Sequence, residues 1–112
     1  MPLPWIKLFT EIIDDPKIGR LPESCKWRFI QLLLLAGECD REGYLIAGEK
    51  ALDCEEIAWR LRLDSDQLTA DFESLVKTNC LAWDQDSNAW VIPKFSERQG
   101  RTTTDQREVW RD

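Results

Sequence analysis

The chain has 112 residues, a hydrophobic content of 43% and a formal net charge of −6. This length accommodates one domain with one core, and the apolar content excludes an intrinsically disordered chain. The longest apolar run, residues 32–36, is much shorter than a membrane-spanning helix. The N-terminal residues MPLPWIKLF lack the pattern of a signal peptide, so we expect a cytoplasmic protein without membrane association.

The negative charge is concentrated in residues 53–86. This segment contains nine acidic residues and three basic ones, whereas acids and bases balance in the rest of the chain. The three bases are Arg60, Arg62 and Lys77. Because Lys and Arg side chains supply most of the affinity for nucleic-acid phosphates, this distribution weighs against strong DNA binding by the segment.

The first part of the chain predicts one dominant helix. Residues 4–9 have an extended or strand-like pattern, and about one helical turn follows before Pro16. A long helix is predicted over residues 23–38, with Ser24 near its start and Gly37 near its end. Its apolar residues cover so much of its circumference that we expect it to be central and largely buried: Phe29, Ile30, Leu32, Leu33, Leu34 and Leu35.

Two helix-start signals follow, eleven residues apart, at Asp53 and Asp64. Each has the spacing of a capping box, with Glu56 or Gln67 at the third position after the cap. Hydrophobic staples flank both caps: Leu52 with Ile57, and Leu63 with Leu68. The pattern predicts helices over residues 54–62 and 65–78, the second with an apolar stripe made by Leu68, Phe72, Leu75 and Val76.

The last predicted element is a β-hairpin. Residues 80–83 and 90–92 flank a polar turn, and a short β-type run at residues 44–46 is available to pair with them. We assign residues 1–95 to one domain and residues 96–112 to a polar, mobile tail or the start of a linker. The order of elements predicts a mainly α fold with a small antiparallel sheet, as in a winged helix-turn-helix.

Between Trp5 and about Gln99 the chain resembles a known family. The segments WIKLFTEIIDDPKIGRL, LLLAGECDREGYL, EEIAWRLRLDSDQL and WVIPKFSERQ look like the N-terminal winged-helix domain of phage replisome organisers. That group is similar to the N-terminal domain of DnaD-type primosome proteins. The resemblance implies a role in starting DNA replication, with a helicase or its loader as partner.

The same resemblance implies a basic segment after the winged helix, and this chain has only a weak version of it. Four arginines, Arg98, Arg101, Arg107 and Arg111, alternate there with acidic residues. Either the chain is a fragment of a longer protein, or it relies on partners to reach DNA.

Candidate DNA contacts come from the second helix of the pair and from its surroundings. In a major groove, Gln67 could bridge adenine and Thr69 could contact a thymine methyl group. Asp66, Asp71 and Glu73 on the same helix oppose this, because only Lys77 offsets them. The candidate nucleic-acid-binding residues are Lys50, Arg60, Arg62, Gln67, Thr69, Lys77, Lys94 and Arg98. A second basic cluster contains Lys17, Arg20, Lys26 and Arg28.

Catalytic and metal sites are not expected. The chain contains no histidine, and its five glycines are scattered, so a common general base and a phosphate-binding loop are both absent. The four cysteines lack C-x-x-C spacing and are predicted to be reduced, mostly buried thiols. We therefore expect no enzyme activity, no cofactor and no metal.

Two hypotheses remain. In the first, a winged helix binds DNA at replication initiation. In the second, the winged helix is an assembly module that self-associates or docks another replication protein, and has little DNA binding of its own. Any of the six tryptophans that is exposed would favour the second hypothesis, because tryptophan is enriched at protein interfaces.

Overall fold

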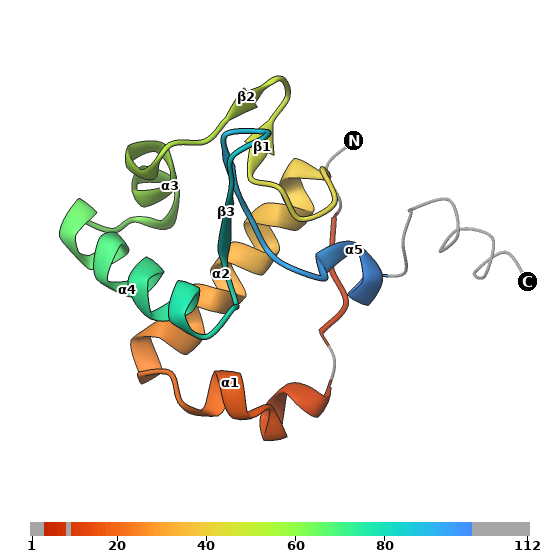
Figure 1. The fold of residues 1–112 in the computed structure, drawn as a ribbon, viewed down its shortest axis with the longest axis vertical. Coiled ribbons are helices and arrows are strands. Elements are labelled where there is room, and N and C mark those ends of the chain that lie inside the picture. Colours follow the sequence, from red (N-terminus) through yellow and green to blue (C-terminus); the bar gives the residue numbers. More distant parts are fainter. Residues whose placement is uncertain (1–3, 9, 100–112) are drawn as a thin grey trace, which may run out of the picture.

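Helices form most of the structure, with two small antiparallel sheets (Figure 1). This computed structural model describes residues 4–8 and 10–99. The elements in chain order are η1 (Thr10–Asp14), α1 (Pro16–Gly19), α2 (Glu23–Cys39), β1 (Ile46–Ala47), β2 (Lys50–Ala51), α3 (Cys54–Leu61), α4 (Ser65–Lys77), β3 (Ala82–Asp84), β4 (Ala89–Val91) and α5 (Phe95–Arg98). The prediction of a mainly α fold with a small antiparallel sheet is confirmed.

Helix α2 crosses the middle of the molecule, and α3, α4 and the hairpin strands lie around it (Figure 1). It ends one residue later than predicted, where Asp40 adopts a left-handed conformation with φ of 54°. Gly37 lies inside the helix near its end, as predicted. A Cβ atom at Gly37 would collide with the Ile6 side chain, so this glycine lets the N-terminal segment pack against α2.

The predicted starts of α3 and α4 are both confirmed. At α3, Asp53 and Glu56 form a complete capping box: the Glu56 N–H donates to Asp53 Oδ1 (2.8 Å) and the Asp53 N–H donates to Glu56 Oε1 (3.1 Å). At α4, the Gln67 N–H donates to Asp64 Oδ1 (2.8 Å), but the Gln67 side chain bonds elsewhere. The second box is thus only half formed.

The core lies where α2, α3 and α4 face one another. Among its side chains with no more than 1% exposure are Leu32, Leu45, Ile57, Leu68, Leu75 and Leu81. The predicted apolar stripe of α4 is buried at Leu68, Phe72 and Leu75, but Val76 is 41% exposed. Leu34 and Trp27 on α2 are also exposed, so this helix is less completely buried than predicted.

The predicted hairpin is formed by β3 and β4, with Trp83 opposite Trp90. The Trp90 ring makes edge-to-face contacts with Trp83 and with Phe72 of α4, at centroid distances of 5.1 and 5.0 Å. These contacts fix the hairpin against α4. Tyr44 forms an antiparallel bridge with Val91, which confirms that the early β-type run pairs with the hairpin.

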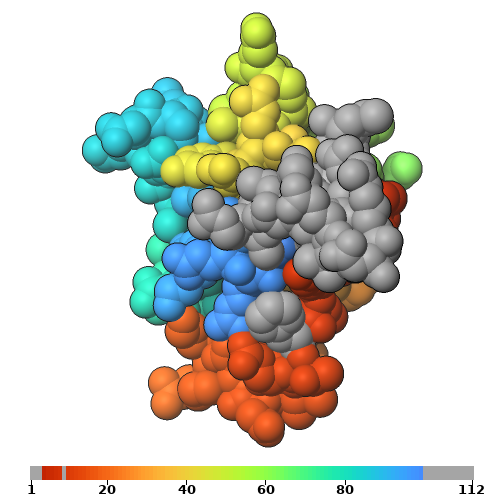
Figure 2. Space-filling view, turned by 90° about the vertical axis from the view of Figure 1, so that its right-hand side faces the viewer, coloured from red at the N-terminus to blue at the C-terminus, as the bar shows by residue number. Residues whose placement is uncertain are grey.

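The β1–β2 hairpin was not predicted. Its turn contains Gly48 at a φ of +66°, a conformation that glycine adopts without strain. Figure 2 shows the turns of the two hairpins as separate projections, one yellow-green at the top and one cyan at the upper left.

The N-terminal segment and the end of the described chain are joined by one side chain. The Lys7 N–H donates to Gln99 Oε1 (2.7 Å), and the Gln99 amide donates to the Lys7 carbonyl (2.9 Å). Phe95 and Gln99 are buried, so residues 96–99, which we had assigned to the tail, belong to the folded body. The remaining predicted tail, residues 100–112, lies outside the described residues.

Candidate functional site

Three of the candidate nucleic-acid-binding residues are in ion pairs with carboxylates. Lys50 Nζ lies 3.2 Å from Glu56 Oε2, and Arg60 pairs with Glu38 at the end of α2. Arg98 of α5 pairs with Glu11 of η1. All of these side chains are partly exposed, so each ion pair adds little stability, but it reduces the positive charge offered to a phosphate.

The other candidates differ in what their side chains do. Arg62 ends α3 at a φ of 63°, and its guanidinium carbon lies 5.7 Å from the Trp59 ring centroid. The Thr69 hydroxyl donates to the Ser65 carbonyl (2.9 Å), and the Gln67 amide donates to Asp71 Oδ1 (3.0 Å). Lys77, the only base of α4, is exposed. Lys94 is exposed too, but it lies in the connection between β4 and α5.

Asp71, one of the three carboxylates of α4 that were counted against DNA binding, does not lie on the surface. It is 2% exposed, and its Oδ2 accepts a hydrogen bond from Arg28 Nε of α2 (2.8 Å). Cys25 Sγ lies 3.2 Å from Asp71 Oδ1, and the Gln67 amide donates to the same oxygen. Arg28, which had been placed in a surface basic cluster, is thus an interior residue that joins α2 to α4.

The β3–β4 hairpin has an acidic turn. Residues 82–91 include Asp84 and Asp86 but no Lys or Arg. Asp84 Oδ2 accepts hydrogen bonds from the Ser87 hydroxyl (2.6 Å) and from the Ser87 N–H (3.2 Å). These hydrogen bonds, the hydroxyl one most of all, lower the pKa of Asp84 below its ordinary value. Asp84 is therefore ionised at neutral pH, and the turn keeps its negative charge.

Four tryptophans are exposed in the described part of the chain: Trp5, which is 40% exposed, lies in the N-terminal segment, and the other three lie on helices or strands. Trp59 of α3 is 72% exposed, Trp27 of α2 is 55% exposed and Trp83 of β3 is 47% exposed. Trp59 borders an open hollow of about 650 Å³ between the end of α2, the β1–β2 hairpin and α3. Large exposed aromatic side chains provide apolar contact area of the kind that protein partners use.

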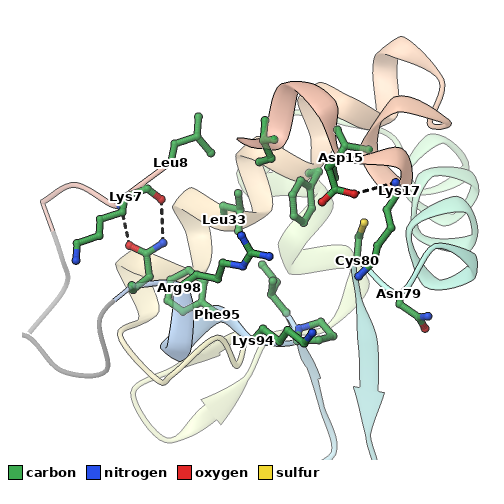
Figure 3. Close-up of a pocket in the computed structure, with 16 residues that line it drawn as sticks. Lys7, Leu8, Asp15, Lys17, Leu33, Asn79, Cys80, Lys94, Phe95 and Arg98 are labelled. Atoms are coloured by element: carbon green, nitrogen blue, oxygen red, sulfur yellow. Dashed lines mark hydrogen bonds between the residues drawn. The ribbon is translucent and has the colours of Figure 1, made fainter. Parts of the chain in front are cut away.

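A cavity of about 310 Å³ lies between the N-terminal segment, α1, α2 and the β4–α5 connection (Figure 3). Its wall is largely apolar and includes Leu8, Ile12, Ile18, Phe29, Leu33, Ile92 and Phe95. Four cationic side chains, Lys7, Lys17, Lys94 and Arg98, also line it, with Asp15 as the single acidic side chain. The cavity thus combines an apolar wall with positive charge, although the chain as a whole is acidic.

The described residues contain no group of His, Cys, Asp or Glu side chains that could hold a metal ion. All four cysteines are free thiols. Cys25 and Cys80 are buried and Cys39 partly so, as expected for mostly buried thiols, and Cys54 is the exposed exception. Burial is the main cause that raises the pKa of the Cys25, Cys39 and Cys80 thiols, which keeps them protonated at neutral pH.

No helix in the described part of the chain has the length and apolar character to cross a membrane. Sequence reasoning identified most residues of α3, α4 and the hairpin that reach the surface, with Val76 as an exception, but it missed the cationic cavity. Its residues come from distant positions, and no local pattern connects them. A scan against models of known protein families, a search of curated proteins and a search of solved structures found no match to this chain.

Proposed function

We propose that this chain is a winged-helix assembly module of a protein that takes part in starting DNA replication. In this proposal it works by binding proteins, either a second copy or a replication protein such as a helicase or its loader. The order of α2, α3, α4 and a β3–β4 hairpin, with Tyr44 bridged to β4, supports the winged-helix interpretation. The role in replication rests on the sequence resemblance described above.

The observation that carries the proposal is the charge of the β3–β4 hairpin. In a winged helix that binds DNA, α4 would enter the major groove and the hairpin would lie beside the phosphate backbone. Here the hairpin carries Asp84 and Asp86, without any Lys or Arg between Ala82 and Val91. Two carboxylates facing a phosphate backbone repel it, so the hairpin is better suited to a protein surface.

The exposed tryptophans support the same conclusion. Trp59 of α3 remains 72% exposed although Arg62 lies over its ring, and Trp83 of β3 remains 47% exposed although it contacts Trp90. A hydrophobic side chain of this size is costly to leave in water and is a frequent centre of binding energy in protein interfaces.

DNA binding is the second candidate, and the position of Asp71 favours it. Because Asp71 is buried and paired with Arg28, two of the three carboxylates that oppose DNA on α4 remain on its surface, Asp66 and Glu73. Lys77 and Arg62 would then supply phosphate contacts, and Gln67 and Thr69 would contact bases.

A fluorescence anisotropy titration separates the two candidates. Labelled duplex and single-stranded DNA would be titrated with folded protein at about 50 mM salt, where non-specific phosphate binding is strong. We expect no binding stronger than a dissociation constant of about 100 μM even at this low salt, because that value is the weak limit for non-specific DNA binders at physiological salt. Micromolar binding that weakens steeply with added salt, and that Lys77→Glu reduces, would contradict the proposal and support DNA binding.

A further inference from the structure

The cationic cavity has the composition of a binding site for an acidic, aromatic partner segment. Its volume of about 310 Å³ is at the lower end of the range for ligand sites, which suits one large side chain. Lys17 and Lys94 are exposed at its edge, and Lys7 is partly exposed (Figure 3). The Asp15 carboxylate accepts the Lys17 N–H (2.9 Å) as the cap of α1, so it is held at the helix start.

The β3–β4 hairpin of the same chain has the complementary composition. Trp83 is 47% exposed, and Asp84 follows it in the sequence, with Asp86 two positions further on. The contact with Trp90 and the strand pairing hold the Trp83 ring in one orientation, so little freedom is lost when a partner binds it. An aromatic ring followed by two carboxylates matches an apolar wall edged by lysines.

A hairpin cannot reach the cavity of its own molecule. Cys80 and Ile92, at the base of the hairpin, line the cavity, whereas the strands run from there to the turn after Asp84. Figure 2 shows the turn as the cyan projection, away from the orange α1 and the blue α5 that border the cavity. A contact between the two surfaces must therefore join two molecules.

We propose that the β3–β4 hairpin of one copy docks in the cationic cavity of a second copy. The Trp83 ring enters the apolar part of the cavity, and Asp84 and Asp86 approach Lys17 and Lys94. The contact is head-to-tail, so each joined pair leaves one free hairpin and one free cavity, and further copies add in the same way. The inference rests on the proposed assembly function and names the partner surface.

The two surfaces are tested separately by two variants. The cavity variant, Lys17→Glu with Lys94→Glu, keeps the hairpin intact. The hairpin variant, Trp83→Ser with Asp86→Lys, keeps the cavity intact and leaves the Asp84–Ser87 hydrogen bonds in place. Lys50→Glu with Lys77→Glu makes the same change in charge as the cavity variant, outside both surfaces, and is the matched control for that variant.

Sedimentation velocity at about 50 mM salt, over protein concentrations from about 1 μM to about 1 mM, measures the association. We expect wild type and the control variant to form larger species as concentration rises. Each surface variant should associate at least about 100-fold more weakly than wild type. In the cavity variant like charges meet, and in the hairpin variant the aromatic contact is lost. An equal mixture of the two surface variants should form a 1:1 dimer and nothing larger, since it contains one intact type of contact.

Circular dichroism first establishes that each variant is folded. A wild-type protein that remains monomeric up to about 1 mM would overturn the inference. So would folded surface variants that associate like wild type, or a mixture that does not dimerise. Self-association that survives both variants would leave the assembly function standing and remove only this mode of contact, whereas tight DNA binding would count against the assembly function itself.

Discussion

The carboxylate of Asp71 and the guanidinium of Arg28 form an ion pair between α4 and α2, with both side chains at least nine-tenths buried. Removing two charges from water is costly, and their attraction offsets that cost only when the remaining polar atoms are bonded. Cys25 and Gln67 also hydrogen-bond to Asp71 here, and no buried side-chain N or O atom among the described residues lacks a partner. The network therefore fixes how α2 packs on α4 more than it adds net stability.

Replacing one residue of this ion pair should destabilise the fold far more than replacing both. We expect Asp71→Ala to lower the free energy of unfolding by about 3–5 kcal/mol, because it leaves the Arg28 charge buried without a partner. The double variant Arg28→Met with Asp71→Leu should have a free energy of unfolding within about 1 kcal/mol of the wild-type value, or above it. Urea denaturation followed by circular dichroism measures both, and equal destabilisation by the single and double variants would count against this account.

The positions of Asp71 and Arg28 in the sequence indicated that both are buried, although charged residues usually lie on the surface. Asp71 lies three positions after Leu68 and four before Leu75, which places it on the apolar face of α4. Arg28 has the same relation to Cys25 and Leu32 on α2. Helical spacing could thus have predicted two opposite charges on two apolar faces, whereas counting Asp71 with Asp66 and Glu73 against DNA binding was wrong.

At the level of elements, local chemistry explains which predictions succeeded. The starts of α3 and α4 were predictable because an N-cap aspartate satisfies backbone N–H groups within its own turn. The β1–β2 hairpin was not predictable, since strands of two residues carry no recognisable alternation. The exposure of Val76 was not predictable from local pattern either, because it depends on which elements cover α4.

The packing of the N-terminal segment on α2 depends on one missing methyl group. Gly37→Ala places a Cβ atom against Ile6, so we expect a loss of about 1–3 kcal/mol in the free energy of unfolding, as in other overpacked contacts. Gly19→Ala is the matched control, because no atom lies within 4 Å of the added Cβ. Thermal and urea denaturation should leave the control within about 0.5 kcal/mol of wild type, and equal losses in the two variants would refute the packing explanation.

At the level of the whole molecule, charge is separated in a way that the sequence does not reveal. The acidic hairpin turn and the cationic cavity lie at opposite ends of the β3–β4 hairpin. Lys7, Lys17 and Lys94 come from three segments that only the tertiary fold brings together. Composition gives the net charge of −6, but only the structure shows that this acidic chain forms a positively charged cavity.

The contact between Lys7 and Gln99 closes the fold across a separation of 92 positions. We expect Gln99→Ala to remove both hydrogen bonds, lower the free energy of unfolding by about 1–3 kcal/mol, and speed hydrogen exchange at the Lys7 N–H. Gln85→Ala, at the exposed hairpin turn, is the control and should change neither quantity. Unchanged exchange at Lys7 in the Gln99 variant would show that this contact does not hold the N-terminal segment.

The same contact determines how the molecule would respond to tension. A force that pulls residue 4 and residue 99 apart loads the two Lys7–Gln99 hydrogen bonds. Once they break, the N-terminal segment can peel from α2 while the three-helix core stays intact. Lys7 and Leu8 would leave the cavity wall in that step, so mechanical load on the chain ends would open the cavity.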